Sequence, residues 1–263
     1  MDSKLLDKYL PTAEEAAFSA GRYLSDHKKD DILVESQQGK DIKISADRES
    51  EEIIIDILSA KSDLAILSEE KGFMEGTQDS DLRWIVDPLD GSLNYFRGIP
   101  NCCVSIGLWS GDKPVLGVIY DFNRKESFTG IAEEGAWLNG SAITVSDINA
   151  ESEAVLFTGF PVNTDFSQEA LKSYIEQVRN FKKIRQIGSA SLSLAYVAAG
   201  RGDAYLEKDI MLWDVAAGLA ILSGAGGKYL IKETPRSYAY DVFATNEFLK
   251  GFLGGEKLRL NEG

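Results

Sequence analysis

The sequence has few of the residues that zinc-dependent or nucleophilic catalysis needs, with one histidine and two cysteines in 263 residues. His27 stands in the polar run SDHKKDD, which is typical of an exposed helix end. Without a second histidine, the usual Cys/His zinc sets lack ligands and a Ser-His-Asp triad has no local support. Cys102 and Cys103 are adjacent, so on a strand they point to opposite faces, and we interpret them as small core residues of a reduced cytosolic protein. We therefore expect catalysis by carboxylates, which favour hard cations such as Mg²⁺.

Excess positive charge and long hydrophobic runs are also missing. The net charge is −14, whereas proteins that bind nucleic-acid phosphates carry a basic face, so we expect no nucleic-acid partner. No apolar run approaches the roughly 20 residues that span a membrane, and the acidic, amphipathic N-terminal segment is unlike a secretory signal. We expect a cytoplasmic globular protein with no membrane association. Its 263 residues, 44% of them hydrophobic, suffice for one large domain or two small ones that share an interface.

Segments with helical and strand periodicity alternate along the chain. Apolar spacing predicts helices over 2–28, 47–59, 167–181, 189–199 and 213–227. We expect Pro11 to split the first helix and Asp47 to cap the second. Strands are predicted at 32–35, 41–45, 65–67, 83–86, 103–109, 114–121, 126–132, 154–160, 203–207 and 242–246, with a turn-rich hairpin at 135–140. Strands 103–109, 114–121 and 126–132 are expected to form an antiparallel meander.

Acidic residues stand where apolar elements begin or end. Glu69, Asp87 and Asp90 follow predicted strands, whereas Asp47 and Asp214 open predicted helices. Carboxylates in such places are costly to bury unless a cation pairs with them. Two metal ions held by shared carboxylates, roughly 3.5–4 Å apart in sites of this kind, would compensate that cost.

The segment DPLDGS, residues 87–92, combines oxygen ligands for cations with N–H groups that can bind an anion. Pro88 stiffens the turn, and the backbone carbonyl of Leu89 is free to act as a further hard oxygen ligand. Gly91 and Ser92 open a short predicted helix, whose free N–H groups and positive dipole end favour an anion. An ordinary acidic turn gives the same local pattern. The strand before it and the matching acids elsewhere favour a phosphate held against divalent metals.

The chain resembles a known family at several places in the family's order. Residues 87–94, DPLDGSLN, are similar to the first signature of the inositol monophosphatase-like, lithium-sensitive, Mg²⁺-dependent phosphatases, and residues 213–218, WDVAAG, are similar to the second. Residues 68–70, SEE, and 43–47, KISAD, resemble the family's upstream glutamate motif and its early aspartate. The positions that match the substrate pocket of the family are Gly188, Ala190 and Glu207.

This resemblance implies an α/β (α+β) fold, a layered αβαβα sandwich. An N-terminal half, residues 1–148, is expected to carry most metal ligands, and a C-terminal half, residues 149–263, to complete the metal and substrate site within a single compact unit. The implied cofactor is Mg²⁺, two or three ions, with Mn²⁺ as a possible substitute. The implied partners are a small phosphorylated metabolite and a second copy of the chain in a homodimer.

The resemblance also implies roles for individual residues. Glu69 and the Leu89 carbonyl would bind the first ion, Asp87 would bridge two ions, and Asp90 and Asp214 would hold the second. A third ion would share Glu69, and the resemblance implies a catalytic role for Glu69 as well as a metal-binding one.

The remaining roles concern the water and the substrate. Ser92 together with Asp47 would orient and deprotonate the attacking water. The N–H groups of Gly91 and Ser92 would hold the phosphate. The alcohol half would contact Gly188, Ala190 and Glu207.

The implied activity is that of a phosphoric monoester hydrolase, Mg²⁺-dependent and sensitive to lithium, acting on a small polyol or sugar phosphate, with inositol monophosphate first. Residues 67–70 are closer to the nucleotidase branch, whereas 92–100 and the spacing from Glu207 to Trp213 are closer to the inositol monophosphatase branch. A 3′(2′),5′-bisphosphate nucleotidase of sulfur metabolism, or another sugar or histidinol phosphatase, therefore remains an alternative. A non-catalytic regulatory protein is the third hypothesis.

Overall fold

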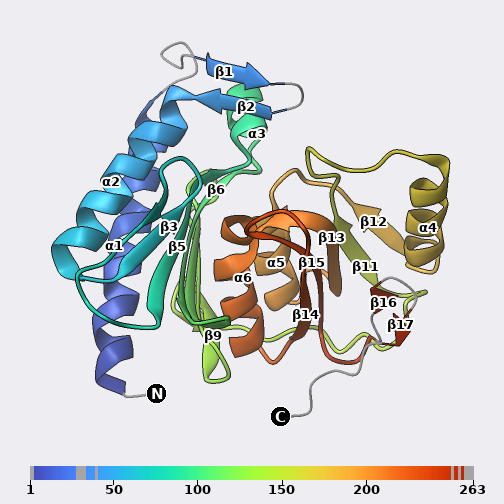
Figure 1. The fold of residues 1–263 in the computed structure, drawn as a ribbon. Coiled ribbons are helices and arrows are strands. Elements are labelled where there is room, and N and C mark those ends of the chain that lie inside the picture. The colour runs from blue at the N-terminus through green and yellow to red at the C-terminus, as the bar shows by residue number, and fades with distance from the viewer. Residues whose placement is uncertain (1–2, 28–33, 39–40, 250–251, 254–255, 258–263) are drawn as a thin grey trace.

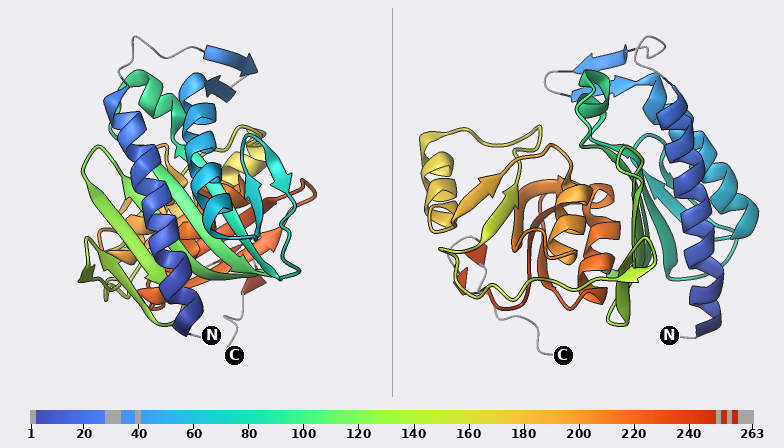
Figure 2. Two further views of the ribbon diagram at one scale, coloured as in Figure 1. Left: turned by 90° about the vertical axis from the view of Figure 1, so that its left-hand side faces the viewer. Right: turned by 180° about the vertical axis from the view of Figure 1, so that it is seen from behind.

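Helices and sheets alternate in five layers in the computed structural model, which describes residues 3–27, 34–38, 41–249, 252–253 and 256–257 (Figures 1 and 2). Helices α1 (Ser3–Asp26) and α2 (Ser45–Lys61) cover the outer face of an eight-stranded sheet. Helices α5 (Ala190–Ala198) and α6 (Leu212–Gly224) lie between that sheet and a five-stranded one. Helix α4 (Gln168–Val178) covers the far side of the second sheet. This is the αβαβα sandwich that the family resemblance implies.

The first sheet has the strand order β10-β9-β8-β7-β6-β5-β3-β4. Its strands are β3 (Ala65–Ser68), β4 (Gly72–Met74), β5 (Leu82–Asp90), β6 (Cys103–Ser110), β7 (Lys113–Asp121), β8 (Glu126–Ile131), β9 (Gly135–Leu138) and β10 (Ser141–Ala142). All neighbours are antiparallel except β3 and β5, which run parallel. The predicted meander is therefore confirmed as β6, β7 and β8, and the predicted hairpin as β9 and β10.

The second sheet has the order β12-β11-β13-β15-β14 and contains two strands that the sequence pattern did not predict. Its strands are β11 (Val155–Thr158), β12 (Lys183–Arg185), β13 (Ala204–Met211), β14 (Lys228–Glu233) and β15 (Ala239–Thr245). The unpredicted strands are β12 and β14, the two edge strands of the sheet. Their side chains are mostly exposed or half-buried, so a hydrophobic pattern is weak in them.

Short elements complete the described chain. Helix α3 (Ser92–Arg97) follows β5, and a hairpin of β1 (Val34–Gln38) and β2 (Asp41–Ile44) precedes α2. Residues 32–33 of the first predicted strand, and residues 2 and 28 of the first predicted helix, lie outside the described residues. A second small hairpin pairs β16 (Phe252–Leu253) with β17 (Glu256–Lys257).

The prediction that Pro11 splits the first helix is wrong, because α1 is continuous through it. Pro11 is exposed, so its ring points away from the sheet. The buried side of the helix packs on the first sheet through a row of alanines: Ala13, Ala16, Ala17 and Ala20. This tertiary packing outweighs the single backbone hydrogen bond that a proline removes.

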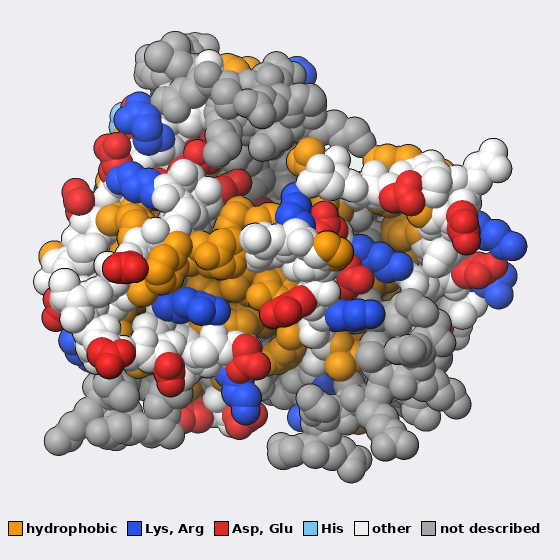
Figure 3. Space-filling view, viewed as in Figure 1, with side chains coloured by type: hydrophobic (Ala, Val, Ile, Leu, Met, Phe, Trp, Pro, Cys, Tyr) orange, Lys and Arg blue, Asp and Glu red, His pale blue; other side chains and the backbone are white. Residues whose placement is uncertain are grey.

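The two cysteines lie on opposite faces of the first sheet, as predicted. Cys103 packs in the core between the two sheets, and Cys102 packs in the core under α1 and α2. Both are free thiols and buried. The surface seen in Figure 3 carries acidic and basic side chains around hydrophobic ones near its middle. Among the described residues, no helix is both long enough and apolar enough to cross a bilayer.

A row of three glycines crosses the first sheet where α6 lies against it. Gly107, Gly117 and Gly130 are direct neighbours on β6, β7 and β8. A Cβ at Gly117 would lie 2.2 Å from the carbonyl oxygen of Ala217, and a Cβ at Gly130 would lie 2.5 Å from the α6 backbone. The helix therefore approaches the strands more closely than side chains would allow, and this fixes the position of Asp214 in its first turn.

We expect Gly117→Ala to lower the free energy of unfolding by about 1–3 kcal/mol, because the added methyl group meets α6 backbone that cannot move aside cheaply. Gly107→Ala is the graded control, since its Cβ would lie 3.1 Å from the nearest α6 atom, and its effect should be smaller. Urea unfolding of both variants measures the difference. Equal stability of Gly117→Ala and the parent chain would contradict this account of the packing.

Candidate functional site

Three carboxylates from two distant parts of the sequence meet at one place. Asp87 and Asp90 end β5, Asp214 lies in the first turn of α6, and each offers an oxygen within 4.8 Å of the others. We call these three residues the carboxylate cluster. Residues three apart on a regular strand point to opposite faces, but a register shift in β5 between Asp87 and Asp90 brings both aspartates to the same site. The bulge was not predicted from the sequence, which indicated that the strand ended at 86.

Burial and mutual repulsion raise the pKa of every member of the carboxylate cluster. Burial, followed by the charges of Glu69, Asp90 and Asp214, raises the pKa of Asp87 well above its usual range. The pKa of Asp90 is raised to about 6, mainly by burial. The pKa of Asp214 is raised to about 7, by burial and then by Asp90. Clustered oxygens of this kind, poorly compensated by the protein, are a donor set that fits Mg²⁺ or Mn²⁺.

Glu69 and Leu89 border the cluster. Glu69 lies in the turn after β3, where its N–H donates to the carbonyl of Val86 at 3.2 Å, and its charge is among those that raise the pKa of Asp87. It is outside the group whose oxygens lie within 4.8 Å of one another. The N–H of Leu89 donates to Asp87 Oδ1 at 3.0 Å, which fixes the orientation of that carboxylate. The structure thus brings the five predicted metal-binding residues into one region, with Glu69 at its margin.

The N-terminus of α5 holds Asp90 in place. Asp90 Oδ2 accepts hydrogen bonds from Ser189 Oγ at 2.6 Å and from the Ser191 N–H at 2.7 Å, and the Ala190 N–H also lowers the pKa of this carboxyl. A negative charge is favoured at this end of a helix. Ser191 Oγ donates to the main-chain oxygen of Asp214 at 2.7 Å, which links two members of the cluster through one helix. Neither serine was predicted as a site residue, although a serine before an apolar helix is a recognisable N-cap signal.

Asp47 and Ser92 form a hydrogen-bonded pair beside the cluster. Helix α2 begins at Ser45, two residues earlier than predicted, so Asp47 is its third residue. Asp47 still caps the helix, because its Oδ2 accepts from the N–H of the N-cap residue Ile44 at 2.8 Å, the contact of a capping box. Its Oδ1 accepts from Ser92 Oγ at 2.8 Å, and the same hydroxyl lies 3.0 Å from the carbonyl of Leu89. Because a hydroxyl has one proton and two lone pairs, Ser92 can donate to Asp47 while it accepts from another donor.

The glycines of the site lie against each other across the two halves of the chain. Gly91 precedes α3 with φ 92°, and a Cβ there would lie 2.8 Å from the Asn101 oxygen and 3.1 Å from the Gly188 oxygen. Asn94 Nδ2, another residue missed from the sequence, donates to the carbonyls of Asn101 at 2.7 Å and Ile187 at 2.8 Å. Gly188 is exposed beside this contact, with φ 74°. The approach of these segments requires glycine at both positions.

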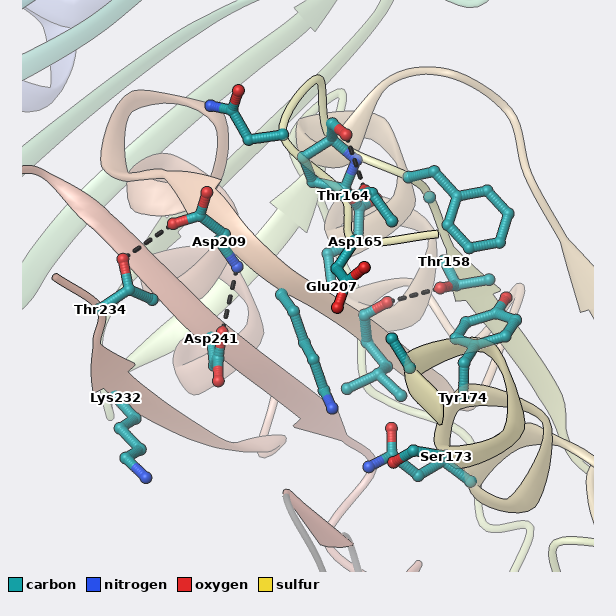
Figure 4. Close-up of a pocket in the computed structure, with 18 of the residues that line it drawn as sticks. Thr158, Thr164, Asp165, Ser173, Tyr174, Glu207, Asp209, Lys232, Thr234 and Asp241 are labelled. Atoms are coloured by element: carbon teal, nitrogen blue, oxygen red, sulfur yellow. Dashed lines mark hydrogen bonds between the residues drawn. The ribbon is translucent and has the colours of Figure 1, made fainter. Parts of the chain in front are cut away.

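Glu207 is buried on β13 between the carboxylate cluster and a cavity. Burial, then Asp214 and Asp90, raises its pKa to about 8. It is one of the residues that line a cavity of about 530 Å³ between α4 and the strands β13 and β14, with Tyr174, Lys208 and Lys232 among the others (Figure 4). No member of the carboxylate cluster lines this cavity. Glu207 connects the cavity to the cluster, because it lines the cavity and lies near Asp214 and Asp90.

Comparison with known proteins gives one consistent similarity. Residues 5–246 match the sequence model described as "Inositol monophosphatase family". The chain is 39% identical over 226 residues to the Nus factor SuhB of Pseudomonas aeruginosa, covering 83% of each protein. It is 34% identical over 257 residues to the fructose-1,6-bisphosphatase/inositol-1-monophosphatase of Aquifex aeolicus, covering 94% of each. The solved inositol monophosphatase of Anabaena (Nostoc) sp. superposes with a TM-score of 0.76 at 36% identity, covering 92% of this chain and 91% of that one.

The raised pKa values predict how stability depends on pH when no divalent cation is present. Between about pH 4, where unfolded aspartates titrate, and pH 7, the folded cluster binds protons that the unfolded chain has released. The cluster's contribution to stability is therefore complete below pH 4 and lost as the pH rises through 6 and 7. We expect the thermal midpoint in EDTA to fall as the pH rises through 6 and 7. Saturating Mg²⁺ should abolish this fall.

Asp214→Asn is the matched variant, because it removes one repelling charge and keeps the side-chain shape. In EDTA it should unfold at a higher temperature than the parent chain at pH 8, and the difference should disappear at pH 5. Identical pH profiles for the two proteins would show that the cluster carries no such repulsion.

Proposed function

The chain belongs to the inositol monophosphatase family, and we propose that within this family it hydrolyses a small polyol or sugar phosphate, inositol monophosphate first. Family membership makes it a phosphatase. The observation that carries the proposal is the carboxylate cluster of Asp87, Asp90 and Asp214 beside the hydrogen-bonded pair of Ser92 and Asp47. Together they offer ligands for divalent cations next to a hydroxyl that can receive a proton.

The family resemblance supports the metal-binding roles, and the donors present fit them. Glu69 and the Leu89 carbonyl would hold a first Mg²⁺, Asp90 and Asp214 would hold a second, and Asp87 would serve both. Mn²⁺ would be a substitute, and a third ion would share Glu69. The oxygens of these residues are hard donors. Burial raises the pKa of Asp87, Asp90 and Asp214, so the negative charge of these three carboxylates is only partly compensated by the protein. When bound, such ions supply Lewis-acid polarisation of the phosphate and neutralise its charge.

The proton steps use the pair beside the cluster. Ser92 Oγ receives a proton from the attacking water as it passes its own proton to Asp47 Oδ1, 2.8 Å away. The water oxygen forms a bond to phosphorus in line with the ester bond that breaks, so no phosphoenzyme forms. Asp214 holds the water that returns a proton to the leaving alcohol oxygen. The products are the free alcohol and inorganic phosphate.

The remaining residues position the substrate. The N–H groups of Gly91 and Ser92, at the start of α3, hold phosphate oxygens. Gly188 and Ala190 contact the alcohol half across the junction between the two sheets. Glu207, which is buried next to Asp214, accepts hydrogen bonds from alcohol hydroxyls.

Two other candidates remain, each with an observation behind it. A bisphosphate nucleotidase needs basic side chains to bind a second phosphate. Lys208 and Lys232 line the same cavity as Glu207. A regulatory role is suggested by relatives named Nus factor SuhB. The cluster of carboxylates in this chain favours catalysis, because a partner-binding surface has no need of buried charges that repel one another.

A panel of phosphorylated metabolites tests the proposal. Inositol 1-phosphate, fructose 1,6-bisphosphate, adenosine 3′,5′-bisphosphate and histidinol phosphate are compared with Mg²⁺, with EDTA, and with Mg²⁺ plus millimolar Li⁺. We expect turnover to be highest on inositol 1-phosphate, to vanish in EDTA and to fall with Li⁺, and Asp87→Asn to be inactive throughout. Preference for the adenosine compound would establish the nucleotidase, and no turnover on any compound would leave the regulatory role.

Removal of the Ser92 hydroxyl separates proton transfer from metal binding. We expect Ser92→Ala to lower kcat by about 100-fold, because the water loses its proton acceptor, while the affinity for Mg²⁺ stays close to that of the parent chain. Ser92→Thr keeps the hydroxyl and should retain most of the activity. Parallel losses of kcat and Mg²⁺ affinity in Ser92→Ala would instead assign the hydroxyl to metal ligation.

The proposal includes a homodimer in the cytoplasm. Size-exclusion chromatography with light scattering measures the oligomeric state directly. A monomer at micromolar concentration would remove the dimer from the proposal and leave the catalytic assignment untouched.

A further inference from the structure

Helix α2 presents a polar face where a helix packed on a sheet normally presents an apolar one. Asp47, Ser50 and Glu51 are spaced by three and four residues, so they lie on one side of the helix. All three are buried, and the exposed fraction of both Ser50 and Glu51 is 0%. The same side continues as apolar Ile54 and Leu58, which are also fully buried. The polar part is therefore confined to the end of α2 nearest the site.

Glu51 holds the turn that carries Glu69. Its Oε1 accepts hydrogen bonds from the Ser68 hydroxyl, from the Glu70 N–H at 3.1 Å and from the Lys71 N–H at 3.0 Å. These donors lie on both sides of Glu69 in the sequence, and the Glu69 N–H is tied to β5. The backbone that carries the Glu69 carboxylate is thus fixed between α2 and β5.

Ser50 holds the segment between the two aspartates of β5. Its hydroxyl donates to the carbonyl oxygen of Pro88 at 2.8 Å. Pro88 lies inside the register shift of β5, where the regular ladder with β6 is interrupted between Asp87 and Asp90. At this point the hydrogen bond from Ser50 takes the place of a backbone partner on β6. It thereby fixes the position of the bulge relative to α2.

Each residue of the α2 face therefore contacts a different segment of the site. Asp47 binds Ser92 at the start of α3, Ser50 binds the bulge at Pro88, and Glu51 binds the turn around Glu69. We propose that Ser50 and Glu51 are positioning residues, which hold the bulge at Pro88 and the turn around Glu69 in the arrangement that a divalent cation needs. The inference rests on the proposed metal site.

The energetic cost of Glu51 supports a positioning role over a filling role. A fully buried carboxylate is expensive even when it is hydrogen-bonded, and its Oε2 has no hydrogen-bond partner among the described residues. A leucine would fill the same space between α2 and β3 at less cost. A leucine, however, has no oxygen that could accept the hydrogen bonds from the turn around Glu69.

The test compares Glu51→Leu with Glu51→Gln by titration of Mn²⁺ into the metal-free protein in a calorimeter. Glu51→Leu removes the acceptor and keeps the packing volume, and we expect the dissociation constant for Mn²⁺ to rise by about 10-fold or more, the usual size of an effect from residues that orient metal ligands. Glu51→Gln keeps an acceptor oxygen at the same place and should bind Mn²⁺ nearly as the parent chain does. Ser50→Ala, a smaller change, should weaken Mn²⁺ binding without loss of the fold.

Leu58→Ala is the control for stability, because it lies on the same face of α2 two turns beyond Glu51. It should lower the thermal midpoint in EDTA and leave the Mn²⁺ dissociation constant unchanged. If Glu51→Leu fails to fold, Ser50→Ala carries the comparison with Leu58→Ala.

The outcomes separate the two proposals. If the parent chain binds no Mn²⁺, the proposed function fails. If the parent binds Mn²⁺ and the folded Glu51→Leu and Ser50→Ala variants bind it equally well, the metal site stands and the positioning role is overturned. Weaker binding in Leu58→Ala to the same degree as in Ser50→Ala would also overturn it, because the effect would then follow stability alone.

Discussion

The repulsion among three carboxylates, two of them buried and the third half-buried, is the constraint around which the structure is arranged. Asp87, Asp90 and Asp214 are held with oxygens within 4.8 Å of one another, although each has a lower free energy as an anion in water. The protein compensates only part of this cost, through the N-terminus of α5 at Asp90 and the Leu89 N–H at Asp87. The raised pKa values of the three carboxyl groups are consistent with a cost that is left partly uncompensated. In the function proposed above, divalent cations would supply the remainder, and the same cations would polarise a phosphate ester for hydrolysis.

Three rigid contacts keep the carboxylates together despite their repulsion. The glycine row of β6, β7 and β8 lets α6 lie close to the first sheet, which places Asp214. The bulge in β5 turns Asp87 and Asp90 toward the same side. The polar face of α2 ties the bulge, the Glu69 turn and Ser92 to a single helix. Since these contacts come from layers on both sides of the first sheet, the site and the αβαβα architecture depend on each other.

Much of the site could be predicted from sequence because its residues are unusual for their surroundings. Asp87 and Asp90 directly follow an apolar strand, and Asp214 opens an apolar helix, so their chemistry is visible without coordinates. The bulge of β5 could not be predicted, because it depends on pairing with β6 and on the hydroxyl of Ser50. Helical spacing places Glu51 on the face of Ile54 and Leu58, but its hydrogen bonds to the turn around Glu69 could not be predicted, because they depend on how α2 packs. Strand β14 was missed because an edge strand has little hydrophobic pattern, and the continuity of α1 was missed because packing outweighs Pro11.

The central claim is that Asp87, Asp90 and Asp214 converge to bind divalent cations. A crystal of the protein soaked in Mn²⁺, with anomalous diffraction measured near the manganese edge, tests it most directly. The account predicts anomalous peaks among these three carboxylates, with the Glu69 carboxylate and the Leu89 carbonyl oriented toward them. Well-ordered carboxylates with no anomalous density between them, or Mn²⁺ bound only elsewhere on the molecule, would contradict it.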